Sequence, residues 1–501
     1  MNATHRRGIA ATAGAALLGV TLLTAGGSAW AAPQDYGNID EDRTGSLTVH
    51  KYLQQSETVT GDPSQGPAEG AFSDPVAGVG FTIYPLLRDG VAIDVTDGDS
   101  WADLSGLTPG AACTAPAGLS LGAPVVMPDT DSSGTATASL PLGAYQVCET
   151  TAPADIIDRA QPFIVVVPTP HQNGWVYDVH AYPKNSAGEI IKSIEQQSDL
   201  GLGSVVTFPV TVPVPRMGEA WSGFAIRDVL DSRLSPVDPA DVAVTVDGAP
   251  LDSAYYTVVN VGQEVTFAMT AEGLAWLDEG PNAHVGAQIT VAFSGTIEQI
   301  GDGEIPNTAV FFPNNPDFDP AANPSLTSNE VKTTWGDITL LKRASGTSGT
   351  TGTLSGAVFE IYAASDPYAD DCTASTATGV PISVDGQTSF TSDADGTIVI
   401  GGLFVSDSVN PAIDATQRCY VLKETVAPAG YVLPADPFTP VAIERGTVTT
   451  DNIEIENSQP GIPVLPFTGS DGQLLLGVAG VGALAVMIGL ILARRKKSAN
   501  A

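Results

Sequence analysis

Short stretches of alternating or β-branched residues recur along most of the chain. Residues 46–50, 163–167, 241–246 and 288–293 are clear examples, and residues that favour turns separate such stretches. Strands this short at this spacing predict β-sandwich domains. Only the stretch around residues 271–279 has a helical pattern, and it is brief.

A degenerate internal repeat indicates how the strands are grouped. Residues 45–51 and 336–342 each end an opening strand with a lysine, and the segment Y-Q-V-C-E-T-T-A-P at 145–153 is similar to Y-V-L-K-E-T-V-A-P at 420–428. We therefore expect the first and third domains to be built alike, with a different sandwich between them. The expected domains are 32–185, 186–333 and 334–459, followed by a linker from residue 460.

The composition agrees with this organisation and excludes one class of partner. At roughly 150 residues per domain, 501 residues correspond to about three domains. The 53 glycines and 37 prolines, among many valines and threonines, disfavour helices. With 21 basic and 56 acidic residues, the formal charge of −35 repels phosphate backbones, so we expect no nucleic-acid partner.

Both ends of the chain have targeting patterns. Residues 1–31 predict a secretory signal peptide, with two arginines, an apolar run and an A-x-A cleavage site. Near the other end, the uncharged run 474–493 has about the 20 residues that a transmembrane helix needs. The basic residues 494–497 would hold the tail on the cytoplasmic side.

The motif directly before that apolar run predicts that the protein becomes covalently attached. It reads L-P-F-T-G and consists of Leu465, Pro466, Phe467, Thr468 and Gly469. The motif, the apolar run and the basic tail together resemble the cell-wall sorting signal of Gram-positive surface proteins. In that family a sortase cysteine attacks the Thr–Gly bond and passes the threonine acyl group to an amine. The resemblance implies a secreted protein that is anchored to the cell wall.

All four cysteines lie in the exported part of the chain, and they allow three pairings. Only Cys113–Cys148 with Cys372–Cys419 keeps each bridge within one domain, so we expect these disulfides, with free thiols as the alternative. The histidines and cysteines have no zinc-ligand spacing. The segment 129–134 hints at a calcium loop but lacks its final glutamate. We therefore expect no metal and no cofactor.

The third domain contains a motif for internal crosslinking. Residues 420–431, Y-V-L-K-E-T-V-A-P-A-G-Y, resemble the E-box of collagen-adhesin B-type Ig-like domains. In that family a lysine of the first strand condenses with an asparagine of the last strand, releases ammonia and leaves an isopeptide bond. The resemblance implies Lys342 and Asn457 as partners and Glu424 as the catalytic acid. Burial would favour a neutral amine and a protonated carboxyl, which this chemistry needs.

The middle domain offers a second set. Lys192 and Asn307 are as far apart in the sequence as Lys342 and Asn457. Residues 225–230 resemble the strand of the collagen-adhesin A-type fold that carries a catalytic aspartate, which implies Asp228 as the acid. Asp231 lies close enough in the sequence to be the alternative.

In the first domain, Lys51, Glu149 and Asn185 could form a third set, with Glu149 as the acid. The motif around Glu149 lacks the final glycine and tyrosine of the E-box. A solvated Lys51 with no partner is therefore an equally good interpretation.

The end of the first domain carries the motif that separates this chain from ordinary wall-anchored adhesins. Residues 175–185, W-V-Y-D-V-H-A-Y-P-K-N, resemble the pilin motif of Gram-positive major pilins, W-x-x-x-V-x-V-Y-P-K-N, with Ala181 in place of a valine. In that family a pilin-specific sortase joins this lysine to the threonine of another subunit. The resemblance implies a link between Lys184 and Thr468 of neighbouring subunits.

Taken together, the chain resembles the shaft pilin of a Gram-positive sortase-assembled fimbria. The resemblance implies three tandem Ig-like β-sandwiches, the first and third of B type and the middle one of A type. It implies a structural subunit that supports adhesion and is no enzyme on other substrates. The implied partners are a pilin-specific sortase, a housekeeping sortase with peptidoglycan, identical subunits, a tip or minor pilin, and a host or bacterial surface receptor. The alternatives are a monomeric wall-anchored adhesin and a basal minor pilin.

Overall fold

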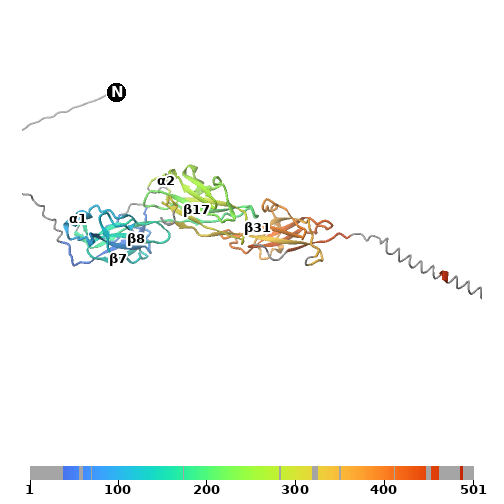
Figure 1. Cartoon of the computed structure of the whole chain (residues 1–501), viewed down its shortest axis with the longest axis horizontal. Coiled ribbons are helices and arrows are strands. Elements are labelled where there is room, and N and C mark those ends of the chain that lie inside the picture. The colour runs from blue at the N-terminus through green and yellow to red at the C-terminus, as the bar shows by residue number, and fades with distance from the viewer. Residues whose placement is uncertain are drawn as a thin grey trace, which may run out of the picture. The chain divides into compact units, whose positions relative to one another are not determined.

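The computed structural model describes residues 38–55, 60–68, 70–172, 174–280, 284–318, 325–348, 351–410, 412–446, 453–461 and 486–488. The chain separates into two compact units, Met1–Ala187 and Gly188–Ala501. Strands dominate both units, which confirms the all-β expectation (Figure 1). The expected signal peptide, the L-P-F-T-G motif and most of the expected transmembrane segment lie outside the described residues. Within the described ranges, no helix is long and apolar enough to span a membrane.

The first unit contains fourteen strands and one α-helix among its described residues. In chain order its elements are β1 (Gly45–His50), β2 (Tyr52–Leu53), β3 (Gly80–Arg88), β4 (Val91–Ala92), α1 (Gly98–Leu104), the 3₁₀ turn η1 (Ala111–Cys113), β5 (Ser120–Leu121), β6 (Val125–Val126), β7 (Thr135–Leu140), β8 (Gly143–Thr151), β9 (Ile156–Asp158), β10 (Phe163–Val167), β11 (Thr169–His171), β12 (Gly174–Val176), β13 (Asp178–Ala181) and β14 (Lys184–Ala187).

Parallel pairing of the first strands with the last defines the first unit. β1 lies between β13 and β7, and β2 pairs in parallel with β14, placing Lys184 opposite Tyr52. A second sheet has the order β10-β8-β3-β4, and alternate residues of both sheets form a core that includes Leu47, Phe81 and Val147. The short break between β1 and β2 therefore lies directly beside the end of the unit.

The second unit begins with strands that form two sheets. Its first elements are β15 (Ile191–Lys192), β16 (Val205–Pro213), β17 (Phe224–Val229), β18 (Leu234–Pro236), η2 (Pro239–Asp241), β19 (Ala243–Val246), β20 (Ala249–Pro250), η3 (Ser253–Tyr255), β21 (Tyr256–Val261), β22 (Glu264–Met269), α2 (Ala271–Leu277), β23 (Gln288–Ile297), β24 (Glu304–Asn307), β25 (Ala309–Pro313) and β26 (Leu326–Thr327). The sheet orders are β15-β16-β23-β19-β20 and β21-β22-β17-β25-β26. Alternate residues of β16 and β23 are buried, as in a strand with one face on a core.

The rest of the second unit forms another pair of sheets. Its elements are β27 (Val331–Ala344), β28 (Val358–Ala364), η4 (Cys372–Ala374), β29 (Ala377–Thr378), β30 (Phe390–Thr391), β31 (Thr397–Asp407), β32 (Gln417–Val426), β33 (Phe438–Glu444) and β34 (Ile453–Asn457). β27 pairs with β24 in its first half, with β31 along most of its length, and in parallel with β34 in its second half. The predicted domain boundary at 333/334 thus falls inside one continuous strand.

The helices divide into one that was expected and one that was not. α2 confirms the helical pattern around 271–279, and the Thr270 side chain caps its first turn. α1 was not predicted, because its seven residues bury no side chain and therefore carry no apolar periodicity. Its start is fixed by Asp97, whose side chain accepts a hydrogen bond from the backbone of Asp99.

Two disulfides close loops in the two units. Cys113 is bonded to Cys148, with Cα atoms 5.9 Å apart, and Cys372 is bonded to Cys419, with Cα atoms 5.4 Å apart. Each bridge ties a 3₁₀ turn, η1 or η4, to a central strand, β8 or β32. A crosslink of this kind stabilises the fold mainly by restricting the unfolded chain.

We predict that the double substitution Cys372→Ser and Cys419→Ser lowers the free energy of unfolding of the second unit by about 3 kcal/mol. Differential scanning calorimetry of the exported chain would measure this as a lower melting temperature for that unit alone. The matched change at Cys113 and Cys148 should shift only the transition of the first unit. Equal shifts of both transitions would contradict the assignment of one bridge to each unit.

Candidate crosslinking and linkage sites

The first unit brings Lys51, Glu149 and Asn185 together inside its core. Lys51 leaves the end of β1, Glu149 projects from β8, and Asn185 is the second residue of β14. The Lys51 Nζ contacts the Asn185 Oδ1 and donates to the Glu149 Oε2 at 2.7 Å. The Asn185 Nδ2 donates to the Glu149 Oε1, also at 2.7 Å. The carboxylate therefore bridges the amine and the amide nitrogen.

Burial of this group excludes a solvated Lys51. Lys51 and Asn185 are both 0% exposed, and the Phe81 ring lies 5.7 Å from the amine. Desolvation lowers the pKa of Lys51 to about 8, although the neighbouring Glu149 opposes the shift. A substantial share of this amine is therefore neutral in mildly alkaline solution, which a nucleophile requires.

The third set has a similar arrangement, with a longer distance between the amine and the acid. Lys342 on β27 lies beside the parallel strand β34, and its Nζ contacts the Asn457 Oδ1 and donates to the carbonyl of Ile455 at 2.9 Å. The Asn457 Nδ2 donates to the Glu424 Oε1 at 2.8 Å, and the Glu424 Oε2 is 3.7 Å from the amine. Desolvation lowers the pKa of Lys342 and raises the pKa of Glu424.

The middle set is assembled around an aspartate. The Lys192 Nζ on β15 contacts the Asp228 Oδ2 on β17, and the Asn307 Nδ2 donates to the same oxygen at 3.4 Å. The rings of Phe208 and Phe293 lie 5.4 and 5.8 Å from the amine. Burial lowers the pKa of Lys192 and raises the pKa of Asp228. Here the lysine and the amide meet at the carboxylate.

Asp231, the alternative acid, has a different partner. Its Oδ1 accepts hydrogen bonds from the Arg233 Nε at 2.8 Å and from the Arg233 backbone at 3.0 Å. Those bonds hold the pKa of Asp231 below its usual value, so it stays ionised. Asp228, not Asp231, is the carboxylate that contacts Lys192.

Two positioning groups escaped the sequence analysis. The side chain of Asn329 accepts from the backbone N–H of Lys192 and donates to its carbonyl, both at 2.9 Å. The backbone N–H of Ala160 donates to the Asn185 Oδ1 at 2.9 Å and to the Glu149 Oε2 at 3.2 Å. Asn329 and Lys192 are far apart in the sequence, and a backbone N–H does not depend on the residue type. No sequence signal therefore marks either group.

Lys184, the lysine of the candidate pilin motif, directly precedes Asn185 on β14. Consecutive residues of a strand face opposite sides, so Asn185 points into the core while Lys184 points outward. The Lys184 Nζ lies 5.6 Å from the centre of the Phe72 ring, which is stacked between Tyr52 and Tyr182. The lysine also lines a cavity of about 450 Å³. Partial burial lowers its pKa, while its candidate partner Thr468 lies outside the described residues.

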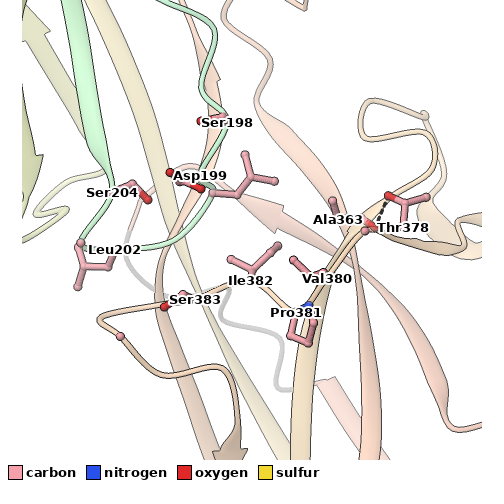
Figure 2. A pocket seen from close by; sticks show the side chains of 14 residues that line it. Ser198, Asp199, Leu202, Ser204, Ala363, Thr378, Val380, Pro381, Ile382 and Ser383 are labelled. Atoms are coloured by element: carbon pink, nitrogen blue, oxygen red, sulfur yellow. Dashed lines mark hydrogen bonds between the residues drawn. The ribbon is translucent and has the colours of Figure 1, made fainter.

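A cavity of about 650 Å³ in the second unit has no comparable chemistry (Figure 2). It is lined by residues between 198 and 204 and between 363 and 386, which contribute glycines, serine and threonine hydroxyls and apolar side chains. Asp199 is the sole ionisable side chain among these described lining residues. The lining therefore offers no pairing of a nucleophile with a base.

Comparisons with known proteins identify the family of the chain. The sequence matches the family of the Gram-positive pilin subunit D1 N-terminal domain over residues 42–186, the prealbumin-like fold domain over 337–458, and the LPXTG cell wall anchor motif over 457–500. It is 37% identical to fimbrial subunit type 2 of Actinomyces naeslundii, over 98% of this chain and 97% of that protein. It is 29% identical to fimbrial subunit type 1 of Actinomyces viscosus, over 98% of each.

A solved structure is similar over most of the chain. The full-length major pilin SpaD of Corynebacterium diphtheriae superposes with a TM-score of 0.69 at 30% sequence identity. The match covers 85% of this chain and 100% of that one.

The lowered pKa of Lys51 predicts a pH dependence of stability when no crosslink can form. In an Asn185→Ala variant, we expect the stability of the first unit to rise as the pH increases from about 8 to 10.5. In that interval the unfolded lysine binds a proton that the folded lysine has lost, so raising the pH favours the folded state.

Chemical denaturation at a series of pH values would measure the effect. A Lys51→Met, Asn185→Ala double variant is the control, and its stability should change less across the same interval. A fall in the stability of the Asn185→Ala variant over this interval would contradict the prediction, because burial would then not disfavour the charged form of Lys51.

Proposed function

The chain belongs to the fimbrial subunits of Gram-positive bacteria, and we propose that an intramolecular isopeptide bond forms in each of its three buried Lys–Asn–acid groups. We also propose that the next subunit of the fibre is joined to the amine of Lys184. The protein is a secreted, cell-wall-anchored structural subunit of a covalent fimbrial shaft, and sortase processes it. The proposal concerns which residues carry the covalent bonds. We also propose that 32–185, 186–333 and 334–459 are its three sandwich domains.

The recurrence of one buried arrangement carries the proposal. In all three groups the lysine and the asparagine are at most 3% exposed, and one carboxyl group contacts both. Burial penalises the charge of a lysine, so a lysine without a reaction to perform would be more stable at the surface than in such a position. Conversion of the amine to an amide removes that charge.

The chemistry balances with the groups that are present. In the first unit the Lys51 Nζ attacks the Cγ of Asn185, and the Glu149 Oε2 takes a proton from the amine. The bond from Cγ to Nδ2 then breaks, and the carboxyl group returns the proton to the nitrogen, which leaves as ammonia. Because the reacting groups are already in contact, proximity supplies much of the rate.

These bonds would strengthen the fold where a fibre is loaded. β27 and β34 are parallel neighbours, as are β2 and β14, so each pair joins the beginning of a domain to its end. Pulling such strands past one another would break their hydrogen bonds together with a covalent bond. The crosslinks therefore protect the subunit against extension.

Lys184 has the features of an acceptor for the intersubunit bond. Its amine is partly desolvated beside an open cavity, and its pKa is lowered, so a neutral nucleophile is more accessible there than on an ordinary surface lysine. We propose that it attacks the threonine acyl group of Thr468, held as a thioester on a pilin-specific sortase. An amide forms and the sortase thiol leaves. A housekeeping sortase would join the finished fibre to peptidoglycan.

Removing the acid should stop the internal reaction in one domain only. We predict that Glu424→Ala leaves Lys342 and Asn457 unjoined, because no group remains to accept and return the proton. Peptide mapping by mass spectrometry would detect the loss of this crosslink and the persistence of the other two. An undiminished Lys342–Asn457 crosslink would refute the role of Glu424.

A matched pair tests the acid of the middle domain. We expect Asp228→Ala to abolish the Lys192–Asn307 crosslink, whereas Asp231→Ala should retain it, because Asp231 binds Arg233 instead. The same mapping experiment reads both variants. The reverse result would transfer the catalytic role to Asp231.

Removing the acceptor lysine should stop polymerisation. In the native host we predict that Lys184→Ala and Lys184→Arg each abolish the high-molecular-weight ladder on denaturing gels, because neither side chain supplies the amine. The control Lys423→Ala should keep the ladder. An intact ladder in both Lys184 variants would favour a monomeric adhesin or a different acceptor.

A further inference from the structure

The amide oxygen of Asn185 has a second donor besides the reacting lysine. The backbone N–H of Ala160 donates to the Asn185 Oδ1 at 2.9 Å and to the Glu149 Oε2 at 3.2 Å. Ala160 belongs to the short connection between β9 and β10, and its side chain is not part of the contact. One backbone group thus touches both the electrophile and the acid.

The amide oxygens of Asn307 and Asn457 in the other two groups have different surroundings. The Asn457 Oδ1 is contacted by the Lys342 Nζ, and the Asn307 Oδ1 is buried with no hydrogen-bond partner. Within the described residues, neither oxygen receives a hydrogen bond from a backbone N–H. The Ala160 contact is therefore specific to the first unit and not a general feature of this chemistry.

We propose that the Ala160 backbone N–H is a catalytic oxyanion donor for the Lys51–Asn185 crosslink, an inference that rests on the crosslink proposed above. When the lysine attacks, the π electrons of the amide move to Oδ1, which becomes negatively charged in the tetrahedral intermediate. The Lys51 Nζ, now bonded to Cγ, can no longer donate to that oxygen. The Ala160 N–H is then the donor that remains, and its hydrogen bond becomes strongest when Oδ1 carries the negative charge.

The surroundings hold this donor in place before the reaction. β9 pairs with β14, placing Asp158 opposite Ser186, and β10 pairs with β8 along five residues. The connection is thereby fixed to the strand that carries Asn185 and to the strand that carries Glu149. A donor aimed in advance needs no reorganisation during the reaction, which is what makes such groups effective.

The test replaces one hydrogen-bond donor without changing a side chain. In cell-free translation of the whole exported chain, lactic acid inserted at position 160 turns the amide N–H into an ester oxygen. After synthesis is stopped, mass spectrometry follows the loss of ammonia at Lys51–Asn185 with time. We expect the rate constant to fall about 10²- to 10³-fold, as for other oxyanion donors. Ala160→Gly, which keeps the N–H, should react at nearly the original rate.

Two internal signals separate chemistry from folding. Only chains with the Cys113–Cys148 bridge and native protease resistance of the first unit are scored, and the Lys342–Asn457 crosslink in the same chain should form at an unchanged rate. A second variant, Ala160→Pro, removes the same hydrogen while keeping the amide, and we expect it to slow the reaction similarly.

The outcomes are distinguishable. An ester variant that crosslinks at the original rate would overturn the role of Ala160 and leave the crosslink itself intact. A slow Ala160→Gly variant would also overturn it, because the effect would then belong to the side chain. An unaltered chain that never joins Lys51 to Asn185 would overturn the proposed crosslink, and the donor role with it.

Discussion

A lysine amine buried in an apolar core is costly to keep charged, and this cost is central to the protein. Lys51, Lys192 and Lys342 are each at most 2% exposed, and aromatic rings line two of the three sites. Burial also raises the pKa of two of the accompanying carboxyl groups, Asp228 and Glu424. Transfer of a proton to the carboxyl group in these two pairs would give the neutral amine that the proposed amide formation requires. In the proposed crosslinking, the same burial that would weaken an ordinary fold would prepare the site for reaction.

Strand β14 carries residues of both proposed linkages, the internal crosslink and the bond between subunits. Lys184 and Asn185 are consecutive, and the alternation of a strand sends one side chain outward and the other into the core. In the proposed shaft, a load that enters at Lys184 would reach the Lys51–Asn185 crosslink one residue away. The aromatic rings of Tyr52, Phe72 and Tyr182 support the outward lysine, so its position depends on packing as well as on the strand.

Candidate site residues could be identified from the sequence where side chains with distinctive chemistry recur in motifs. Lys342, Glu424 and Asn457 could be identified because the segment around Glu424 is long and specific, and the structure brings them into contact. For Lys51 the motif was incomplete, and burial, which no local pattern reveals, decided against a solvated lysine. The choice between Asp228 and Asp231 likewise needed the position of Arg233. The continuity of β27 and the Ala160 donor depend on backbone geometry and therefore left no trace in residue types, while helix α1 was marked only by its cap, Asp97.

The most direct test of the account is the intact mass of the unaltered exported chain, residues 32–468, followed by peptide mapping. The account predicts a mass lower by one ammonia for each of the three crosslinks, with joined peptides at Lys51–Asn185, Lys192–Asn307 and Lys342–Asn457. A mass equal to that of the chain with its two disulfides and no other bond would contradict it. The buried lysines would then be ion pairs only, and the fold would have no covalent bond between first and last strands.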